Sequence, residues 1–407
     1  MAGPQIAKEY FEHALAFVDE VVRGYPGRTL GERSCLEAGQ RIAAELERHC
    51  DPGSVRSEEF SCHPRAFLKV LRVAVILYVV ATVAVVRGKP LVALGALLLS
   101  LSLWLCQVVL YLRVFDVFYP KRNGINVWGR VEPAGEVLQQ VILSGHHDAP
   151  WVFHYIDWSP RRGPLVAALG VVTFFVALLI AGYQLGSGGC PWWMQAIVGG
   201  GLVLVVPLWW FTTNAVSPGA GDNMIGSALA VEATRIFADA KREGKPLLAH
   251  TRILCLSLDG EECGLRGSMD FVKRYRDELS AIKTYVFNID TVYQADRLHF
   301  IDRDLNLTVP CSRAMAEELT GIARGLGYGA QVSQLPFGAG STDAASFAKA
   351  GIEATTLIAV NLDLAKLDRD LVYHTPRDLT ASIQPEVVSQ CLHVMRDYLL
   401  ARDRAGP

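Results

Sequence analysis

Four long apolar runs constrain what this chain can fold into, and the second pair lies in a stretch from Gly163 to Gly221 without a charged residue. The runs cover residues 70–86, 91–112, 164–183 and 192–216. Each is close to the roughly 20 apolar residues that a helix needs to cross a bilayer. Four buried core helices are the alternative, but runs of this length in near-adjacent pairs favour the membrane. We therefore expect four transmembrane spans, arranged as two hairpins.

Positive charge is unevenly distributed around the two expected hairpins. Their tips carry only Arg87 and Lys89. The opposite side carries Arg65, Lys69, Arg72, Arg113, Lys121, Arg122, Arg161 and Arg162. Because Lys and Arg concentrate on the cytoplasmic side of membrane proteins, we expect the soluble part to be cytoplasmic. The first 66 residues contain no apolar signal segment, and nine cysteines without framework spacing agree with a reducing compartment.

The remaining sequence alternates between strand-like and helix-like patterns. Helices are expected at residues 5–22, 31–49, 223–241, 265–275, 311–325, 342–350 and 386–402, and strands at 141–144, 253–258, 285–289, 298–301 and 354–358. This alternation predicts an α/β fold, a three-layer sandwich around a mostly parallel or mixed central sheet. Residues 67–113 and 163–216 would be hairpins inserted into one domain, which is made of a helical part at 1–66 and of residues 114–162 and 217–407.

Seven acidic and histidine residues lie at ends of expected strands, at the start of a helix or on a late loop: His146, Asp148, Asp222, Glu261, Glu262, Asp290 and His374. Ligands in open α/β sheets gather at the carboxyl ends of strands, so these side chains are expected to converge. Their imidazole nitrogens and carboxylate oxygens suit a pair of zinc-like ions.

Each motif also has a purely structural interpretation. In His-x-Asp the carboxylate can hold the second ring nitrogen of a ligand His146, although strand-end His and Asp residues often only cap or face solvent. Asp222 alone is more often a helix N-cap. The adjacent Glu261 and Glu262 are a more specific signal of a metal site, because they lie at the end of an expected strand and are followed closely by a glycine. At such a position one glutamate can bind metal and the other can activate water. Asp290 and His374 could be structural if taken singly.

The order of the motifs is the specific signal. His-x-Asp, Gly-x-Asp-Asn, Glu-Glu, Asn-x-Asp and Tyr-His-Thr-Pro-x-Asp together resemble the zinc-dependent exopeptidases that include bacterial leucyl aminopeptidases, glutamate carboxypeptidases and glutaminyl cyclases. The resemblance covers residues 123–162 and 217–400, extends weakly over 5–66, and excludes the hairpins. It departs at Thr342-Asp343-Ala344, where Ser-Asp-His or Ser-Asp-Tyr is usual, so the lining of the substrate pocket stays open.

The resemblance implies a role for each residue of the set. Asp222 would bridge two divalent metal ions, most simply Zn²⁺. His146 and Asp290 would complete one ion, and Glu262 and His374 the other. Glu261 would be the general base, and Asp148 would orient His146.

The resemblance implies a di-zinc aminopeptidase acting on short peptides, and the four apolar runs add a membrane anchor. A carboxypeptidase, an amide deacylase, glutaminyl cyclisation and a non-catalytic receptor remain alternatives. The aromatic residues between His146 and the second hairpin favour hydrophobic or membrane-proximal peptides as substrates, and the lipid bilayer is the other expected partner. A net charge of −2 gives no indication of nucleic acid binding. Side-chain specificity, the native metal and the oligomeric state stay open.

Overall fold

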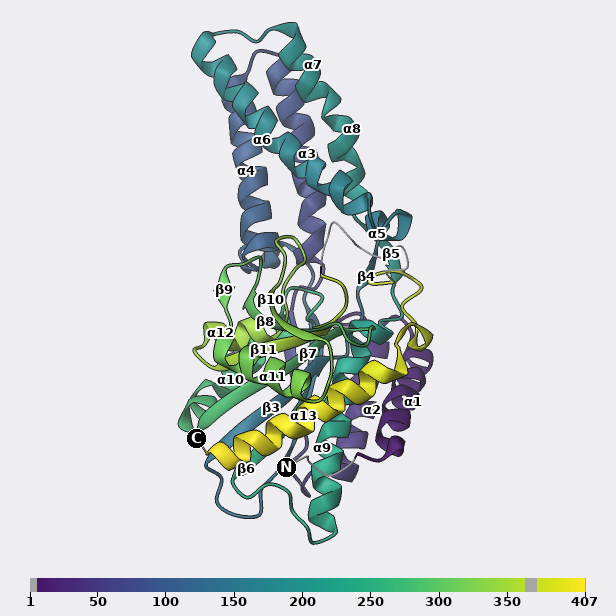
Figure 1. The fold of residues 1–407 in the computed structure, drawn as a ribbon. Coiled ribbons are helices and arrows are strands. Elements are labelled where there is room, and N and C mark those ends of the chain that lie inside the picture. The colour runs from purple at the N-terminus through teal and green to yellow at the C-terminus, as the bar shows by residue number, and fades with distance from the viewer. Residues whose placement is uncertain (1–5, 363–371, 407) are drawn as a thin grey trace.

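A mixed nine-stranded sheet forms the centre of the soluble part (Figure 1). The computed structural model describes residues 6–362 and 372–406. The strand order is β1-β2-β6-β3-β7-β11-β8-β10, with β9 beside β8. Their bounds are β1 Arg56–Cys62, β2 Arg122–Val131, β3 Gln139–His146, β6 Thr251–Leu258, β7 Lys283–Val292, β8 Leu298–Asp304, β9 Val309–Pro310, β10 Ala330–Gln334 and β11 Glu353–Ala359.

The four central strands β6, β3, β7 and β11 are parallel, which places their carboxyl ends at one edge. Every residue of β3 is buried, as the apolar run Val141–Leu143 requires in a strand covered on both faces. Strand β2 pairs antiparallel with β6, and β8 pairs antiparallel with β11. The α/β sandwich expected from the sequence is confirmed.

Helices cover both faces of the sheet. The larger core contains apolar residues of α1 (Lys8–Gly24), α2 (Arg33–His49), α9 (Ile225–Arg242), α11 (Arg313–Gly325) and α13 (Pro385–Ala405). A second core on the other face contains Phe271 and Phe347, from α10 (Arg266–Ala281) and α12 (Ala344–Lys349), packed against Ile142 and Leu256. The two cores make the domain three layers deep.

Four helices long and apolar enough to cross a membrane project from one side of this domain, away from the two chain ends (Figure 1). They are α3 (Ala66–Val86), α4 continued by η1 (Pro90–Val109), α6 (Gly163–Ser187) and the segment Trp192–Trp210, which contains α7 (Trp192–Gly200), α8 (Leu202–Val205) and η3 (Val206–Trp210). They share their own apolar core, in which the Tyr78 hydroxyl donates to the carbonyl oxygen of Val198 at 2.9 Å. Outward-facing apolar residues such as Leu179 and Val203 are exposed.

Two apolar runs end earlier than the sequence indicates. The second helix ends at Val109, and the fourth ends at Trp210. Residues Thr212–Val216 form strand β5, which pairs with β4 (Trp151–Phe153) in a separate two-stranded sheet. Polar, β-branched Thr212 and Thr213 favour a strand over a further turn of membrane helix. The chain therefore enters and leaves the second hairpin through a small sheet.

Candidate metal site

Parallel strand ends bring most of the metal-type residues together. His146 is the last residue of β3, Glu261 and Glu262 lie on the turn after β6, and Asp290 lies near the end of β7. Asp222 lies in η4 (Ala220–Met224), directly before α9, and has non-helical backbone angles. The structure thus places strand-end residues and the start of a helix around one point.

His374 reaches this point from a loop near the second hairpin. Its backbone has a positive φ of 54°. Its carbonyl oxygen accepts a hydrogen bond from the backbone N–H of Phe153 in β4 at 3.0 Å. The rings of Phe153 and His374 lie 4.0 Å apart between centroids. The small β4–β5 sheet therefore holds one of the two imidazoles.

The Asp222 carboxylate lies between the two imidazoles. Its Oδ1 is 3.5 Å from Nε2 of His146, and its Oδ2 is 3.0 Å from Nε2 of His374. The backbone N–H groups of Gly221 and Asp222 donate to the carboxylate of Asp378 at 2.8 and 3.2 Å, which fixes the turn. Burial raises the pKa of Asp378 to about 7, and repulsion from Asp222 is the second cause of this shift.

The other carboxylates divide between the two ends of Asp222. Glu262 Oε1 lies 3.5 Å from Nε2 of His374. Glu261 Oε2 and Asp290 Oδ2 each lie 3.9 Å from Nε2 of His146. These separations exceed an ordinary hydrogen bond. The possible metal-ligand atoms therefore form two groups, one around His146 and one around His374, and Asp222 lies between them.

Asp148 supports both the imidazole and the two glutamates. Its Oδ1 lies 3.2 Å from Nδ1 of His146. Its two carboxylate oxygens also accept the backbone N–H groups of Glu261 and Glu262, each at 3.2 Å. A carboxylate behind a ligand histidine fixes the ring and its tautomer. The position that sequence reasoning gives to Asp148 agrees with this geometry.

Among the described side chains, two imidazoles, those of His146 and His374, offset the negative charge of this group. Burial raises the pKa of Glu262 well above its usual range, and repulsion from Asp222 adds to this. Burial also raises the pKa of Asp290 to about 8. Within residues 6–362 and 372–406 no Lys or Arg forms an ion pair with these carboxylates. His146, Asp222 and Glu262 each offer a ligand atom within 4.8 Å of the others. Buried carboxylates and imidazoles without a Lys or Arg partner fit divalent ions.

Tyr111 is a site residue that sequence reasoning missed, because it lies inside the apolar run 91–112. Its ring is buried and packs edge-on against Phe67 at 4.6 Å. Burial raises the pKa of its phenol well above 10, and the nearby charges of Glu261, Asp304 and Glu262 add to this. Among the described residues its hydroxyl makes no hydrogen bond. The end of the first hairpin thus places a phenol within electrostatic reach of the two glutamates.

Tyr373 and Asp343 also interact electrostatically with the metal-type group. Burial raises the pKa of Tyr373 well above 10, with added repulsion from Asp222 and Glu262. Burial raises the pKa of Asp343 to about 6, although His146 opposes the shift. The sequence flags Asp343 only as a departure from the exopeptidase pattern, because a buried aspartate carries no periodic signal.

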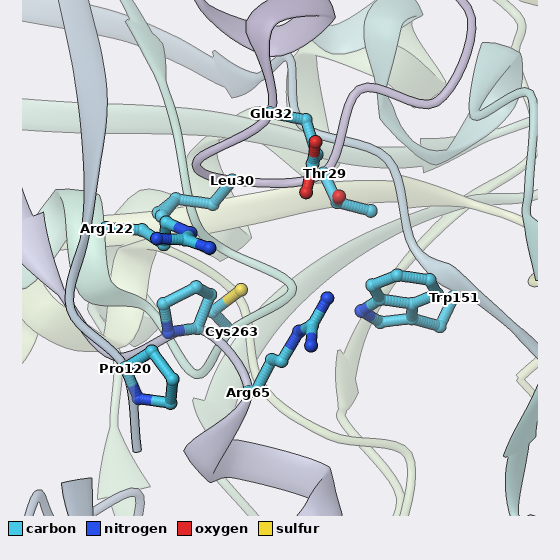
Figure 2. A pocket seen from close by; sticks show the side chains of 9 residues that line it. Thr29, Leu30, Glu32, Arg65, Pro120, Arg122, Trp151 and Cys263 are labelled. Carbon is cyan, nitrogen blue, oxygen red and sulfur yellow. The ribbon is translucent and has the colours of Figure 1, made fainter. Parts of the chain in front are cut away.

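A shallow pocket lies beside the turn that carries Glu262 (Figure 2). Cys263, the next residue, forms part of its wall together with Trp151. Arg65 and Arg122 project into it near the first residue of α3. This pocket contains none of the metal-type residues, and Cys263 is its one lining residue on the turn that carries the two glutamates.

Comparison with known proteins agrees with this geometry. A sequence profile of peptidase family M28 matches residues 208–399, which include Asp222, the two glutamates, Asp290 and His374. The expected resemblance to zinc-dependent exopeptidases is confirmed, and the matched segment covers slightly less than half of the chain. The expected enzyme class, a zinc-dependent metallopeptidase, and its two zinc ions are thereby confirmed. No curated protein sequence matches the chain.

Solved structures share the fold of this chain. A zinc aminopeptidase from Bacillus subtilis superposes with a TM-score of 0.55 at 14% identity, covering 95% of this chain and 94% of that one. A Fimbriiglobus ruber glutaminyl cyclase gives 0.57 at 13%, covering 98% of each chain. A Zn-dependent exopeptidase from Parabacteroides distasonis gives 0.55 at 15%, covering 98% of this chain and 100% of that one. At these identities the likeness concerns the fold.

Proposed function

We propose that this chain is a membrane-anchored di-zinc aminopeptidase that removes N-terminal residues from short peptides. The observation that carries the proposal is the position of Asp222, whose two oxygens face different imidazoles at 3.5 and 3.0 Å. A carboxylate that presents one oxygen to each of two donor groups can bridge two ions. The two imidazoles lie on different elements, since His146 ends β3 and His374 lies on a loop.

In this proposal His146 and Asp290 hold one ion, Glu262 and His374 hold the other, and Asp222 bridges them. When bound, the pair of ions lowers the pKa of a shared water and polarises the scissile carbonyl. The protein contributes a rigid frame, since Asp148 orients His146 and also fixes the turn of Glu261 and Glu262.

Glu261 is the proposed general base. Its Oε2 lies 3.9 Å from Nε2 of His146, beyond hydrogen-bond distance, and the residue is 9% exposed, so its carboxylate is not tied to this imidazole. Burial raises the pKa of Glu261 well above its usual range; His146 opposes the shift, whereas Glu262 and Asp290 add to it. A carboxylate with a raised pKa can take the proton of the attacking water and return it to the leaving amine.

The charge of the cleft favours an aminopeptidase over a carboxypeptidase. The carboxylates of Glu261, Glu262 and Asp290 cluster with Asp343, which repels Glu261. No described Lys or Arg forms an ion pair with this set. With two divalent ions bound, Glu262 and Asp290 would be neutralised, which leaves Glu261 and Asp343 as the carboxylates that favour an α-ammonium group over an α-carboxylate on the substrate.

Glutaminyl cyclisation is a second candidate, because the F. ruber cyclase gives the highest of the TM-scores reported above. Incubation of a peptide library with the detergent-purified protein distinguishes aminopeptidase activity from glutaminyl cyclisation. Metal content is measured on the same sample. The aminopeptidase proposal expects stepwise release of N-terminal amino acids from a peptide library, loss of activity with a chelator and recovery with Zn²⁺. Loss of ammonia from N-terminal glutamine, without release of amino acids, would favour cyclisation.

We also propose that the four apolar helices span the membrane and that the peptidase domain is cytoplasmic. The uneven distribution of Lys and Arg supports this orientation. Cys35 and Cys391 are buried, so they cannot report sidedness, and exposed positions are needed. An impermeant thiol reagent added to intact cells should label Lys89→Cys at a hairpin tip and spare Glu278→Cys on the domain surface. The reverse pattern would place the domain outside the cytoplasm.

A further inference from the structure

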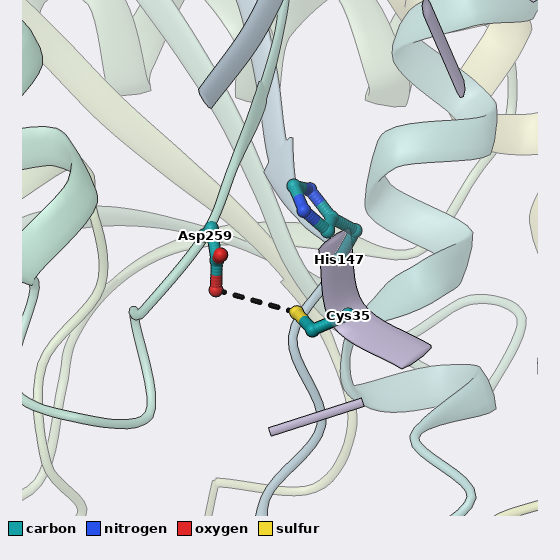
Figure 3. A group of neighbouring side chains, drawn as sticks. All are labelled: Cys35, His147 and Asp259. Atoms are coloured by element: carbon teal, nitrogen blue, oxygen red, sulfur yellow. Dashed lines mark hydrogen bonds between the residues drawn. The ribbon is translucent and has the colours of Figure 1, made fainter. Parts of the chain in front are cut away.

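A second cluster of metal-type side chains lies outside the catalytic group. Cys35 of α2, His147 just after β3 and Asp259 just after β6 are fully buried, and their ligand atoms lie within 4.8 Å of one another (Figure 3). Consecutive residues at a strand end point to opposite faces. His146 therefore faces Asp222, whereas His147 faces α2. The cluster shares no residue with the catalytic set.

His147 has one ring nitrogen held and the other free. Nδ1 lies 2.9 Å from the hydroxyl of Ser257, which in turn lies 2.7 Å from the hydroxyl of Ser227. Nε2 is buried and has no hydrogen-bond partner in the described part of the chain. A hydroxyl or carboxylate on the second nitrogen is the usual arrangement behind a ligand histidine. A free, buried Nε2 in a polar cluster calls for a ligand.

The side of His147 facing α2 is kept open by a glycine. A Cβ at Gly39, one helical turn after Cys35, would lie 3.2 Å from Nε2 of His147. It would also lie 2.7 Å from Cγ2 of Ile125, so close packing of α2 on the sheet contributes to the need for glycine. Any larger residue at 39 would press on the free nitrogen.

The other two side chains supply the donors that a thiophilic ion prefers. Sγ of Cys35 lies 3.4 Å from Oδ1 of Asp259. Oδ2 of Asp259 is occupied by the backbone N–H of Ile125 at 2.9 Å, which leaves Oδ1 for the cluster. Sulfur, imidazole nitrogen and carboxylate oxygen are all zinc ligands. Burial, followed by the charges of Asp259 and Asp148, raises the pKa of the Cys35 thiol well above its usual range, and Arg28 opposes this shift. The free thiol therefore keeps its proton, and a bound cation would have to displace it.

We propose that Cys35, His147 and Asp259 bind a third divalent ion of the zinc type, which pins α2 to the ends of β3 and β6. Water would fill the fourth position of a tetrahedron. On binding, the Cys35 thiol loses its proton to solvent and the thiolate forms the bond to the metal. The competing arrangement is a metal-free cluster in which the thiol donates to Asp259 and Nε2 stays unpaired.

Cobalt substitution of the full chain in detergent tests the proposal. The proposed catalytic ligands are nitrogen and oxygen only, so Co²⁺ bound there gives no sulfur-to-cobalt charge-transfer absorption. A third ion on Cys35 gives this near-ultraviolet band. Cys35→Ala should remove the band and lower the metal content by one ion per chain. Cys391→Ala, at another fully buried cysteine without a metal-type neighbour, should keep both.

The wild-type protein alone can overturn the proposal, whether or not Cys35→Ala folds. X-ray absorption at the zinc edge should detect a sulfur neighbour at about 2.3 Å for a minority of the bound zinc. Absence of both the sulfur neighbour and the cobalt band in a protein that carries its catalytic ions would leave the hydrogen-bonded cluster. A band that persists in folded Cys35→Ala would also contradict it. Neither result would affect the peptidase proposal, which rests on other residues.

Discussion

The carboxylate of Asp148 accepts a hydrogen bond from the backbone N–H of Glu261, with 3.2 Å between Oδ1 and N, across 113 positions of sequence. The same oxygen lies 3.2 Å from Nδ1 of His146. One buried side chain thus sets the position of an imidazole and of the turn that carries both glutamates. Asp148 connects the two halves of the site that lie on either side of the second hairpin.

Asp148→Asn should therefore damage catalysis more than stability. The amide keeps the shape, but its NH₂ group must face a backbone N–H or His146, where an acceptor is required. We expect kcat/KM to fall by about 10–100-fold, as for other partners of ligand histidines. Steady-state kinetics with metal analysis and a melting curve test this. Full activity in the variant would show that Asp148 does not position His146.

Glu261 and Glu262 are adjacent but should respond differently to substitution. Glu261→Gln removes the proposed base and should lower kcat by about 100–10,000-fold while both ions remain bound. Glu262→Ala removes a proposed ligand and should lower metal content as well as activity. Metal analysis of both purified variants decides between the roles. Loss of metal in Glu261→Gln, but not in Glu262→Ala, would mean that the two assignments are exchanged.

Much of this site could be predicted from the sequence, because its residues follow apolar runs that read as strands. Val141–Leu143 and Ile253–Leu256 are continuous apolar segments, and parallel strands bring their ends together. Strand β1 was missed, since residues 56–62 carry charge and lie at the sheet edge with an irregular burial pattern. Strand β5 was absorbed into the fourth membrane run, because hydropathy alone does not separate a strand from the end of a helix.

Tyr111 could not be predicted because its environment is created by distant contacts. The carbonyl oxygen of Tyr111 accepts a hydrogen bond from Arg266 at 3.2 Å. Arg266 also pairs with Asp116 at 3.2 Å, and the side-chain amide of Asn306 donates to the carbonyl oxygen of Val109 at 3.0 Å. These contacts, spread over the chain, turn the residue out of the membrane helix and toward the glutamates.

Tyr111→Phe should lower kcat/KM by roughly tenfold or more, the effect of one hydrogen bond to a charged or reacting group. The phenol lies near Glu261 and Glu262 and has no hydrogen-bond partner among the described residues, so it is available to a bound peptide. Tyr78→Phe, within the membrane bundle, is the control, and it should change stability without changing kinetics. Equal kinetics for Tyr111→Phe and wild type would make the phenol a packing residue.

Acid sensitivity should arise partly from Glu45 in α2, which is 1% exposed. A hydrogen bond from His49 lowers the pKa of Glu45 to about 2; burial opposes the shift, and Arg41 adds to it. The folded pKa lies below the unfolded value of about 4.3. Glu45 therefore stabilises the fold above about pH 4.3, and this contribution is lost as the pH falls through that value toward 2.

Glu45→Gln tests this contribution. We expect it to lower the free energy of unfolding by about 1–2 kcal/mol at neutral pH, after allowance for solvent screening. The difference from wild type should shrink as the pH approaches 3. Denaturant unfolding at several pH values measures it, with Glu12→Gln in the exposed pair with Lys8 as the control. A difference that does not depend on pH would show that Glu45 acts through packing.

The second hairpin should influence which peptides are cleaved. It leaves the domain beside His146 and returns beside Asp222, and strand β4 holds His374 through Phe153. With the proposed membrane spans, the metal-type group would lie close to the membrane surface, so peptides delivered by the bilayer should reach it most readily. Replacing residues 164–210 with a Gly/Ser linker removes the membrane part and leaves β4 and β5 in the chain. The first hairpin then serves as the anchor.

Two peptides with the same N-terminal residue, one with an apolar tail and one with a polar tail, provide the measurement in reconstituted vesicles. In the linker variant kcat/KM should fall by about tenfold for the apolar peptide, which corresponds to about 1.4 kcal/mol or two buried methylene groups. It should change little for the polar peptide. An equal loss for both peptides would indicate general damage to the site. Unchanged kinetics for both, with metal retained, would reduce the hairpin to an anchor.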